Sequence, residues 1–572
     1  AMQKRWHVPP VITPEADRNL DAFHPVLRQL LFNRGYATEG QARAFLGGEP
    51  GFSTDPFELS GMAAVVDRVR FAVEHRQPVA VYGDYDVDGV TATALLVEAL
   101  RDLDTDVRPY IPNRFDEGYG LNTEALDNLK AEGVRLVITM DCGIRSPQEA
   151  RHARDIGLDL IISDHHHPAD GDLPQAVAIV NSKLPGDEYP DKNLAGVGIA
   201  FKIAEALESA GSSRGNLVSL LDLVALGTVA DLAPLIGENR GLVRRGLDQI
   251  RNTQRQGLFS LANVAAMQIS KTTANQIGFM LGPRLNAAGR LKSAKAALEL
   301  LMTNDPSRAG LLAQELDANN QERQTVTRET QIKAEALATA GEEDPDLLFA
   351  AHEDFNPGVV GLAASRLVEA HYRPAVVAAK GPDETRGSCR SIPEFHITDA
   401  LDKCADLLVR HGGHAAAAGF TVRNENLPRL IERLKALAAA ELGQQDLHPT
   451  LYGDMELTLS TLNFELLRHL GGLEPTGYGN REAVFVSRGV KVKSSRVVGA
   501  DGRHLKLTLQ DERGVTTDAI GFRLGHLQPE LPSRVDLAYT LESNDYNGRT
   551  TLQLNLKDIR APRDHGWGAA SA

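Results

Sequence analysis

The stretch from residue 79 to residue 89, VAVYGDYDVDG, constrains the fold more than any other part of the chain. Its apolar start predicts a buried strand and residues 90–100 predict a helix, so three aspartates fall in the turn between them. Asp84, Asp86 and Asp88 stand at alternate positions and would repel one another unless a cation neutralised them. Mg²⁺ and Mn²⁺ prefer such oxygen-rich sites. On this stretch alone, an ordinary turn in which Asp and Gly cap the helix is an equal alternative.

Composition restricts the class of protein without fixing its partner. The 572 residues allow several domains, and three scattered cysteines indicate neither a disulfide framework nor a zinc cluster. The formal net charge of −15 argues against a surface covered by phosphate-binding cations, although a local basic channel remains compatible with it. There is no secretory signal and no apolar run of membrane-spanning length, so we expect a cytoplasmic protein.

From about residue 61, amphipathic helices alternate with short apolar strands. Helices are predicted at 62–74 and 90–103, and strands at 79–81, 107–111, 136–140, 158–162 and 176–180. This alternation predicts a parallel α/β sheet, whose ligands bind at the carboxyl ends of the strands. Residues 1–60 are interpreted as an arm that packs on the rest of the chain.

Polar residues of metal-ligand type follow the later strands. Asp141 comes after 136–140, Asp164-His165-His166 come after 158–162, and Asp231 ends the apolar helical segment 220–229. Parallel neighbours would bring the strand ends into one cleft, where such residues around two ions can activate water and hold a phosphoryl oxygen. The alternative, isolated caps and hydrogen-bonded polar residues, keeps about one chance in ten.

These motifs together resemble the successive motifs of the DHH phosphoesterase superfamily. The later segments are similar to the bacterial single-strand-specific 5′→3′ exonucleases of that superfamily, over residues 60–560. The resemblance implies two Mn²⁺ or Mg²⁺ ions per site. One ion is held by Asp86 and Asp141, and the other by Asp88, Asp141, His165 and Asp231.

The resemblance also assigns roles beside the ions. Many members carry a histidine where this chain has Tyr82, and Asp84 is expected to replace it as a ligand. His166 is expected to face the phosphate and assist the leaving group, and Asp164 to orient its neighbours.

Substrate contacts are implied in two further segments of the first half. Arg114 and Tyr119 lie in 113–120, where an arginine can pair with a backbone phosphate and a tyrosine can stack on a base. Arg284, Asn286 and Arg290 lie in 282–290, which is interpreted as a glycine-punctuated loop near the 5′ end of the strand.

The middle of the chain predicts a bridge and a second domain. Residues 311–340 lack a turn signal and predict one long solvated helix. A second α/β domain, similar to DHHA1, is expected from about 346, with a strand at 347–351 and a helix at 359–369. Ser388 and Arg390 are implied to hold a 5′-phosphate together with Arg284. Gly412-Gly413-His414 is interpreted as a phosphate-binding glycine nest before an alanine-rich helix.

The last hundred residues predict a small β-barrel. Strands at 483–492, 504–509, 515–522, 535–541 and 550–556, with a turn at Asn547-Gly548, indicate an OB-fold that binds single strands. Tyr539 or Tyr546 would stack on bases. The cations expected to line its groove are Lys491, Lys493, Arg496, Arg503 and Lys506.

We therefore predict an α/β protein with an arm (1–60), a DHH catalytic domain (61–305), a connecting helix (306–345), a DHHA1 domain (346–445), an OB-fold (450–562) and a disordered tail (563–572). The expected function is two-metal 5′→3′ hydrolysis of single-stranded DNA to mononucleotides in recombination and repair. We expect a monomer, with a helicase and a single-stranded-DNA-binding protein as partner classes. Two alternatives stay open: a DHH enzyme for short oligonucleotides or cyclic dinucleotides, and a non-catalytic replication scaffold. A Rossmann-type nucleotide binder is excluded, because the first turn lacks G-x-G-x-x-G.

Overall fold

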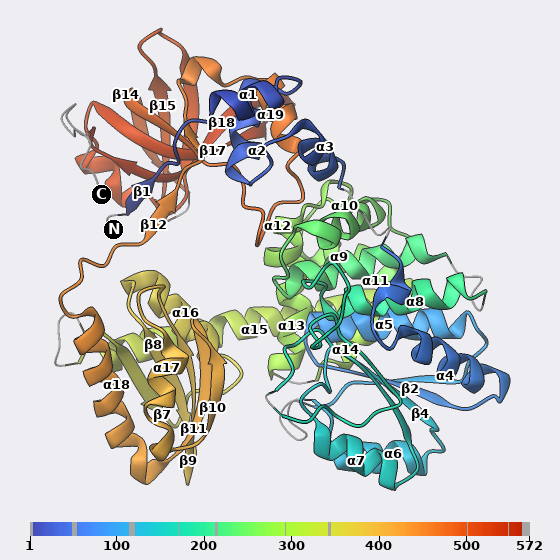
Figure 1. Cartoon of the computed structure of the whole chain (residues 1–572). Coiled ribbons are helices and arrows are strands. Elements are labelled where there is room, and N and C mark those ends of the chain that lie inside the picture. Colours follow the sequence, from blue (N-terminus) through green and yellow to red (C-terminus); the bar gives the residue numbers. More distant parts are fainter. Residues whose placement is uncertain are drawn as a thin grey trace.

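The computed structural model describes residues 4–48, 54–113, 120–169, 171–211, 216–291, 293–340, 345–499, 501–546 and 548–562. Three bodies are visible: a large first α/β domain, a smaller second α/β domain and a β-barrel, with one long helix running between the first two (Figure 1). Among the helices in these ranges, none combines the length and apolar character of a membrane span.

The first domain is built on a five-stranded parallel sheet, as predicted. Its order is β3 (Val107–Tyr110), β2 (Val79–Gly83), β4 (Leu136–Met140), β5 (Asp159–Ser163) and β6 (Ala178–Val180). Strands β2 and β4 are buried along their whole length, which explains their unbroken apolar runs. One face is covered by α6 (Thr123–Ala131) and α7 (Pro147–Asp155). The other face is covered by α4 (Met62–Glu74), α5 (Val87–Arg101) and α8 (Gly196–Ser209), and α9 (Leu221–Ala230) packs on α5 and α8.

Several helices extend the first domain beyond the sheet. They are α10 (Gly237–Arg251), α11 (Gln256–Val264), α12 (Ala274–Gln276), the π-helix η4 (Ile277–Leu281), α13 (Gly282–Leu291) and α14 (Lys295–Met302). The loop predicted at 282–290 is therefore wrong. The wider π turn before Pro283 relieves the crowding that proline causes in a helix. Gly289 serves packing instead, because a Cβ there would lie 2.7 Å from the Tyr85 carbonyl oxygen.

Helix α15 (Pro306–Ala338) confirms the predicted long helix. Asp305 caps it, and Pro306 occupies the first turn, where a missing N–H costs nothing. Its first half contributes Leu312 and Leu316 to the core of the first domain, and its last turns contribute Ala334 and Ala338 to that of the second. The helix thus connects the two domains, and each of its ends is part of one domain's core.

The second domain has a mixed sheet in the order β10 (Leu408–His414), β11 (Ala417–Arg423), β9 (Glu384–Arg390), β8 (Ala375–Lys380) and β7 (Leu348–His352). The helices α16 (Val360–His371), α17 (Ile397–Asp402) and α18 (Leu427–Leu442) pack on it. The predicted helix after Gly412-Gly413-His414 is wrong, because β10 and β11 form a hairpin there. Pairing of β11 with β9 overrides the helical propensity of the alanines, and Gly413 has a φ of +151°.

The C-terminal region forms the expected barrel. Its strands are β13 (Met455–Glu456), β14 (Phe485–Val498), β15 (His504–Gln510), β16 (Thr516–Gly521), β18 (Arg549–Arg560) and β17 (Arg534–Tyr546), and pairing of β14 with β17 closes it. Tyr539 cannot stack on a base, because it is fully buried and its hydroxyl lies 2.9 Å from Ser487 Oγ. Asn547, the Tyr546 side chain and the tail 563–572 lie outside the described residues.

The N-terminal arm packs on the barrel at the other end of the chain. Strand β1 (Arg5–His7) pairs in parallel with β12 (Thr450–Tyr452). The helices α2 (Pro25–Asn33) and α3 (Glu39–Gly47), with Leu20 at the end of α1 (Pro14–Asn19), share a core with barrel residues, and both segments lie together in Figure 1.

Candidate active site

The carboxyl ends of three adjacent strands bring the acidic motifs together. Strand β2 leads to Asp84 and Asp86, β4 leads to Asp141, and β5 leads to Asp164 and the histidine pair. Asp231 arrives from a different direction, at the C-terminal end of α9. We name the group formed by Asp84, Asp86, Asp88, Asp141, His165, His166 and Asp231 the acidic cluster.

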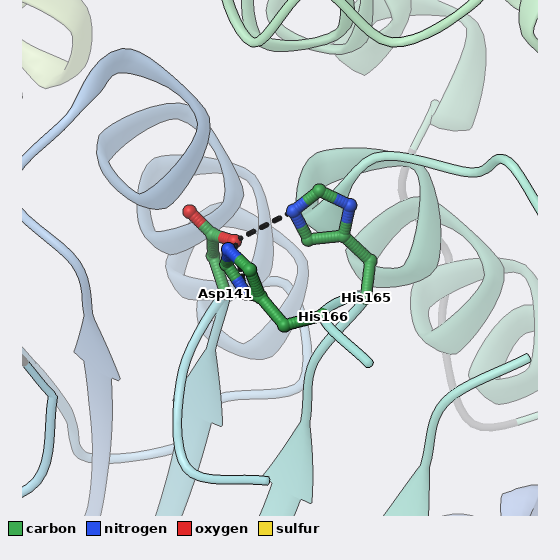
Figure 2. Close-up of side chains that lie close together, drawn as sticks. All are labelled: Asp141, His165 and His166. Carbon is green, nitrogen blue, oxygen red and sulfur yellow. Dashed lines mark ion pairs between the residues drawn. The ribbon is translucent and has the colours of Figure 1, made fainter. Parts of the chain in front are cut away.

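Distances within the acidic cluster suit metal ligation. His165 Nε2 lies 3.0 Å from Asp141 Oδ1 and 3.7 Å from both Asp88 Oδ2 and Asp231 Oδ2. Figure 2 shows the rings of His165 and His166 close to the Asp141 carboxylate, with the His165–Asp141 ion pair dashed. Three overlapping sets of side chains offer ligand atoms within 4.8 Å of one another: Asp84, Asp86 and Asp141; Asp88, His165 and Asp231; and Asp141, His165 and His166.

Burial explains why the acidic cluster calls for a cation. Burial, followed by the charge of Asp86, raises the pKa of Asp88 to about 7. Burial, followed by the charge of Asp88, raises the pKa of Asp231 to about 9. The same two causes raise the pKa of Asp141 well above its usual range. Burial, and then His166, lowers the pKa of His165 to about 3, so its ring stays neutral. His165 Nε2 is buried without a hydrogen-bond partner among the described residues, as a metal-binding nitrogen would be.

The backbone of α8 holds Asp88 in place. The two carboxylate oxygens of Asp88 accept hydrogen bonds from Gly196 N at 2.7 Å and Val197 N at 2.8 Å, at the positive N-terminal end of α8. A Cβ on Gly196 would lie 2.8 Å from Asp141 Cβ and 2.9 Å from Asp88 Oδ2. Our sequence reasoning missed this glycine; its signal was the small-residue start of an apolar helix, Ala195-Gly196-Val197-Gly198.

Asp141 occupies an uncommon backbone conformation. Its φ is +62°, in the left-handed region that aspartate tolerates better than most residues. Gly143 follows with a φ of +107°. The sharp turn after β4 directs the Asp141 carboxylate toward His165, and such strain is typical of functional sites.

His166 is oriented by Asp164. Its Nδ1 lies 2.8 Å from Asp164 Oδ1, while Asp164 Oδ2 accepts a hydrogen bond from Ile144 N at 3.0 Å. Burial opposes ionisation of both groups, but the bond between them outweighs it, raising the pKa of His166 and lowering that of Asp164. Asn181 Nδ2 donates to the His166 carbonyl oxygen at 2.8 Å and fixes the backbone.

Two predicted residues lie outside the acidic cluster and support its surroundings. Tyr82, in the expected histidine position, donates its hydroxyl to the Gly120 carbonyl oxygen at 2.9 Å, on the α6 side of the sheet. Asn286 Oδ1 accepts a hydrogen bond from Val87 N at 3.1 Å, so it secures the first turn of α5.

The two arginines of α13 face the long helix and the second domain. Arg284 Nε donates to Asp317 Oδ1 at 2.9 Å, and Arg290 Nη1 donates to the Gly358 carbonyl oxygen at 3.3 Å. Arg284 is therefore paired with a carboxylate of α15. Arg114 and Tyr119 lie outside the described residues.

Ser388 and Arg390 lie together at the N-terminal end of α16. A Cβ on Gly361 would be 3.0 Å from Arg390 Nη2 and 3.5 Å from Ser388 Oγ. A hydroxyl, a guanidinium and a helix N-terminus together suit an anion. Burial lowers the pKa of His167, and the charges of Lys183 and then of His414, on the β10–β11 hairpin, lower it further.

Lys183 is a further residue beside the acidic cluster that the sequence reasoning missed. It follows β6, and its backbone N–H donates to Asn181 Oδ1 at 2.9 Å. Burial lowers its pKa, whereas the charges of Asp231 and Asp164 oppose that shift. A lone lysine after a strand offers no sequence signal for this position.

Family profiles match three parts of the chain: the DHH family N-terminal domain over residues 78–228, the DHHA1 domain over 344–440 and the RecJ OB domain over 453–558. A Bacillus subtilis relative, the single-stranded-DNA-specific exonuclease RecJ, is 38% identical over 98% of this chain and 71% of its own length. The Escherichia coli protein of the same name is 36% identical over 94% and 96%.

Solved structures of RecJ from Thermus thermophilus have the same fold. The complex with Mn²⁺ covers 99% of this chain and 81% of its own, with a TM-score of 0.85 and 31% identity. The complex with Mg²⁺ covers 99% and 80%, with a TM-score of 0.79 and 29% identity.

Proposed function

The chain belongs to the RecJ family of single-stranded-DNA-specific exonucleases, and on this premise we propose that it hydrolyses single-stranded DNA in the 5′→3′ direction to mononucleotides. Enzyme class and metal dependence follow from the family, whose members have been solved with Mn²⁺ and with Mg²⁺. The direction of cleavage and the roles of single residues are part of the proposal.

The observation that carries the proposal is the acidic cluster. Asp84, Asp86 and Asp141 would hold one ion, and Asp88, Asp141, His165 and Asp231 the other, with Asp141 shared. Two such ions, when bound, supply an activated water and stabilise charge on the attacking and leaving oxygens.

The neighbours of the acidic cluster handle protons and negative charge. His166, with its pKa raised by Asp164, can donate a proton to the leaving oxygen or bond to a phosphate oxygen. Lys183 adds a positive charge that interacts with that of Asp231. Both residues compensate the charge of a phosphodiester held over carboxylates.

The direction of cleavage is proposed from the opposite side of the site. Ser388 and Arg390 at the N-terminus of α16 are suited to a terminal 5′-phosphate, with Arg284, Arg290 and His414 on neighbouring segments. A 5′ end held there places the next phosphodiester over the acidic cluster, so mononucleotides leave one after another. Arg114 and Tyr119 are retained as proposed strand contacts.

The two alternatives are not favoured. A scaffold has no need of five buried or half-buried carboxylates that repel one another without cations. An enzyme for short oligonucleotides or cyclic dinucleotides does not need the barrel, which matches the RecJ OB domain. We place the activity in DNA recombination and repair, in the cytoplasm, with a monomeric enzyme working beside a helicase and a single-stranded-DNA-binding protein.

The test is degradation of 5′-phosphorylated, 3′-labelled single-stranded DNA with Mn²⁺, with Mg²⁺ and with EDTA. We expect metal-dependent release of mononucleotides from the 5′ end, little cleavage of a blunt duplex, and none by Asp141→Ala. Asp127→Asn, a surface aspartate paired with His152, is the control and should cut normally. Cleavage from the 3′ end, or equal rates on duplex, would contradict the proposal.

A further inference from the structure

The two halves of the proposed active site lie in different domains. The acidic cluster belongs to the first domain, whereas Ser388 and Arg390 lie on β9 of the second, beside the first turn of α16. We name these two residues and that turn the phosphate pocket. A strand held there by its 5′-phosphate is cut quickly only if the spacing between the two halves is fixed, because a misplacement of about 1 Å can cost about 100-fold in rate.

The connecting helix does not fix this spacing by itself. About 27 Å of α15 separates Leu316, in the core of the first domain, from Ala334, in the core of the second. Long helices curve, so a small bend over this length moves one domain relative to the other. A further contact between the domains, nearer to the acidic cluster, would remove that freedom.

Residues 356–358, the loop before α16, make such a contact with the end of α13. Arg290 Nη1 donates a hydrogen bond to the Gly358 carbonyl oxygen at 3.3 Å. The two backbones also meet, because a Cβ on Gly358 would overlap the Arg290 carbonyl oxygen. Gly358 is buried, so a larger residue there would have to push the loop away from α13.

The loop is held in place on its own side as well. Asn356 Oδ1 accepts a hydrogen bond from Gly358 N at 2.8 Å, in a turn that asparagine forms readily. Phe355, just before the loop, is buried in the core of the second domain. The loop then leads directly into the first turn of α16, so its position determines that of the phosphate pocket.

Helix α13 completes the connection to the acidic cluster. Gly289 packs on the Tyr85 carbonyl oxygen and Asn286 Oδ1 accepts from Val87 N, so α13 holds both sides of the acidic turn after β2. A continuous series of close contacts therefore runs from the phosphate pocket through Gly358 and α13 to the acidic cluster.

We propose that Asn356 and Gly358 are positioning residues that set the distance between the phosphate pocket and the acidic cluster. This inference rests on the proposed function and deepens it: the loop and α13 form a spacer that places the first phosphodiester over the metal ligands. Neither residue needs to touch the strand. Their effect is confined to strands with a 5′-phosphate, since a strand with a 5′-hydroxyl is not anchored and can slide into a productive position.

The test compares two oligothymidylates of equal length, one with a 5′-phosphate and one with a 5′-hydroxyl. In Gly358→Ala the added methyl group displaces the loop, so kcat on the phosphorylated strand should fall by about 10–100-fold. KM for that strand should change less than ~2-fold, because the phosphate pocket is intact, and kcat on the hydroxyl strand less than ~3-fold. Affinity for Mn²⁺, measured by calorimetry, should be unchanged.

Asn356→Ala tests the same contact without added bulk. It leaves the Gly358 N–H without its acceptor and loosens the loop, so the advantage of the phosphorylated strand in kcat should fall by about 3–10-fold. Asn356→Asp keeps an oxygen acceptor for that N–H and should retain most of the advantage. Gly310→Ala, in α15 with open space around it, is the control and should match the unsubstituted protein on both strands.

Unchanged kcat on the phosphorylated strand in both Gly358→Ala and Asn356→Ala would overturn the inference. Equal losses on the two strands would also overturn it, since they would come from a general disturbance of the fold or of the acidic cluster. An unsubstituted protein that cut both strands equally fast would exclude the phosphate pocket, and this inference with it. If the unsubstituted protein cut neither strand, the proposed function itself would fail.

Discussion

At the scale of residues, two histidines that are neighbours in the chain have opposite electrostatic environments. His165 is buried, its Nε2 lies 3.0 Å from Asp141 Oδ1 but has no hydrogen-bond partner among the described residues, and burial lowers its pKa to about 3. His166 is bonded to Asp164, and its pKa is raised. One ring is therefore kept as a neutral ligand and the other as a proton carrier.

Asp164→Asn should separate these roles. The substitution removes the carboxylate that raises the pKa of His166, so the imidazole ring loses its proton at a lower pH than in the unsubstituted protein. We expect turnover at pH 8 to fall by about 100-fold or more, and the alkaline limb of the pH–rate profile to move to lower pH. The measurement is kcat against pH at saturating Mg²⁺. Asp127→Asn should leave the profile in place, and an unshifted limb in Asp164→Asn would rule out this role.

Metal binding should tighten as pH rises. The raised pKa values, about 7 for Asp88 and about 9 for Asp231, mean that protons occupy these carboxylates at low pH and must leave when a cation binds. The affinity for Mg²⁺ is then lowest below pH 7 and rises about 10-fold per pH unit for each proton displaced. Calorimetry between pH 6 and pH 8.5, in buffers of different ionisation enthalpy, measures both affinity and proton release. A pH-independent affinity without proton release would contradict this expectation.

At the scale of elements, helix α13 supports the acidic turn after β2. Asn286 bonds to Val87 N, and Gly289 packs on the Tyr85 carbonyl oxygen. The helix therefore carries a supporting function that a loop could not supply, because both contacts require fixed positions one turn apart.

Gly289→Ala should push this turn out of place. Its Cβ would lie 2.7 Å from a backbone oxygen, so α13 or the turn must move. We expect at least a 10-fold weaker affinity for Mn²⁺ and a lower melting temperature. Gly310→Ala, in α15 with open space around it, is the control and should stabilise the fold by about 0.5–1 kcal/mol. Equal metal affinity in both variants would contradict the supporting role.

The local pattern of apolar residues predicted helices and strands well where buried positions recur at the regular spacing of a helix or a strand. The strands of the first sheet, the first strand of the second sheet, the long helix and the five main barrel strands lie near their predicted places, because unbroken or alternating apolar runs leave little choice. The strand ends likewise predicted which motif acids would meet. The predictions failed where contacts with distant segments determine the structure. Gly289 packs against the Tyr85 carbonyl oxygen, the alanines of β11 pair with β9, and Tyr539 is buried inside the barrel.

At the scale of the whole molecule, Arg240 joins three parts of the chain. Its buried guanidinium donates to the carbonyl oxygens of Phe45 in the arm and of Gly472 and Leu473 in the barrel domain, at 2.8–3.0 Å. It also lies 4.0 Å from the centre of the Phe45 ring. Since Arg240 belongs to α10, it fixes the arm and barrel to the first domain.

Arg240→Met should uncouple the barrel from the first domain. The carbonyl groups would be left buried without hydrogen-bond donors, and each would lower the free energy of unfolding by about 1–3 kcal/mol. We expect a separate, earlier unfolding transition in scanning calorimetry, and faster proteolysis near residues 443–450. Arg468→Met, exposed on α19 (Phe464–Gly471), should unfold as the unsubstituted protein does. A single unshifted transition in Arg240→Met would exclude the coupling.

The pairing of β1 with β12 has a consequence for biosynthesis. A ribosome makes Arg5 some 445 residues before Thr450, the residue opposite it in the parallel pair. At ordinary rates of translation, the apolar faces of α1 to α3 wait roughly 20–90 s for the barrel that will cover them. During that interval Leu27, Leu30 and Leu31 are a natural binding site for a chaperone. A fragment that ends before the barrel keeps that uncovered surface permanently, so it will stay soluble only if residues 4–48 are removed as well.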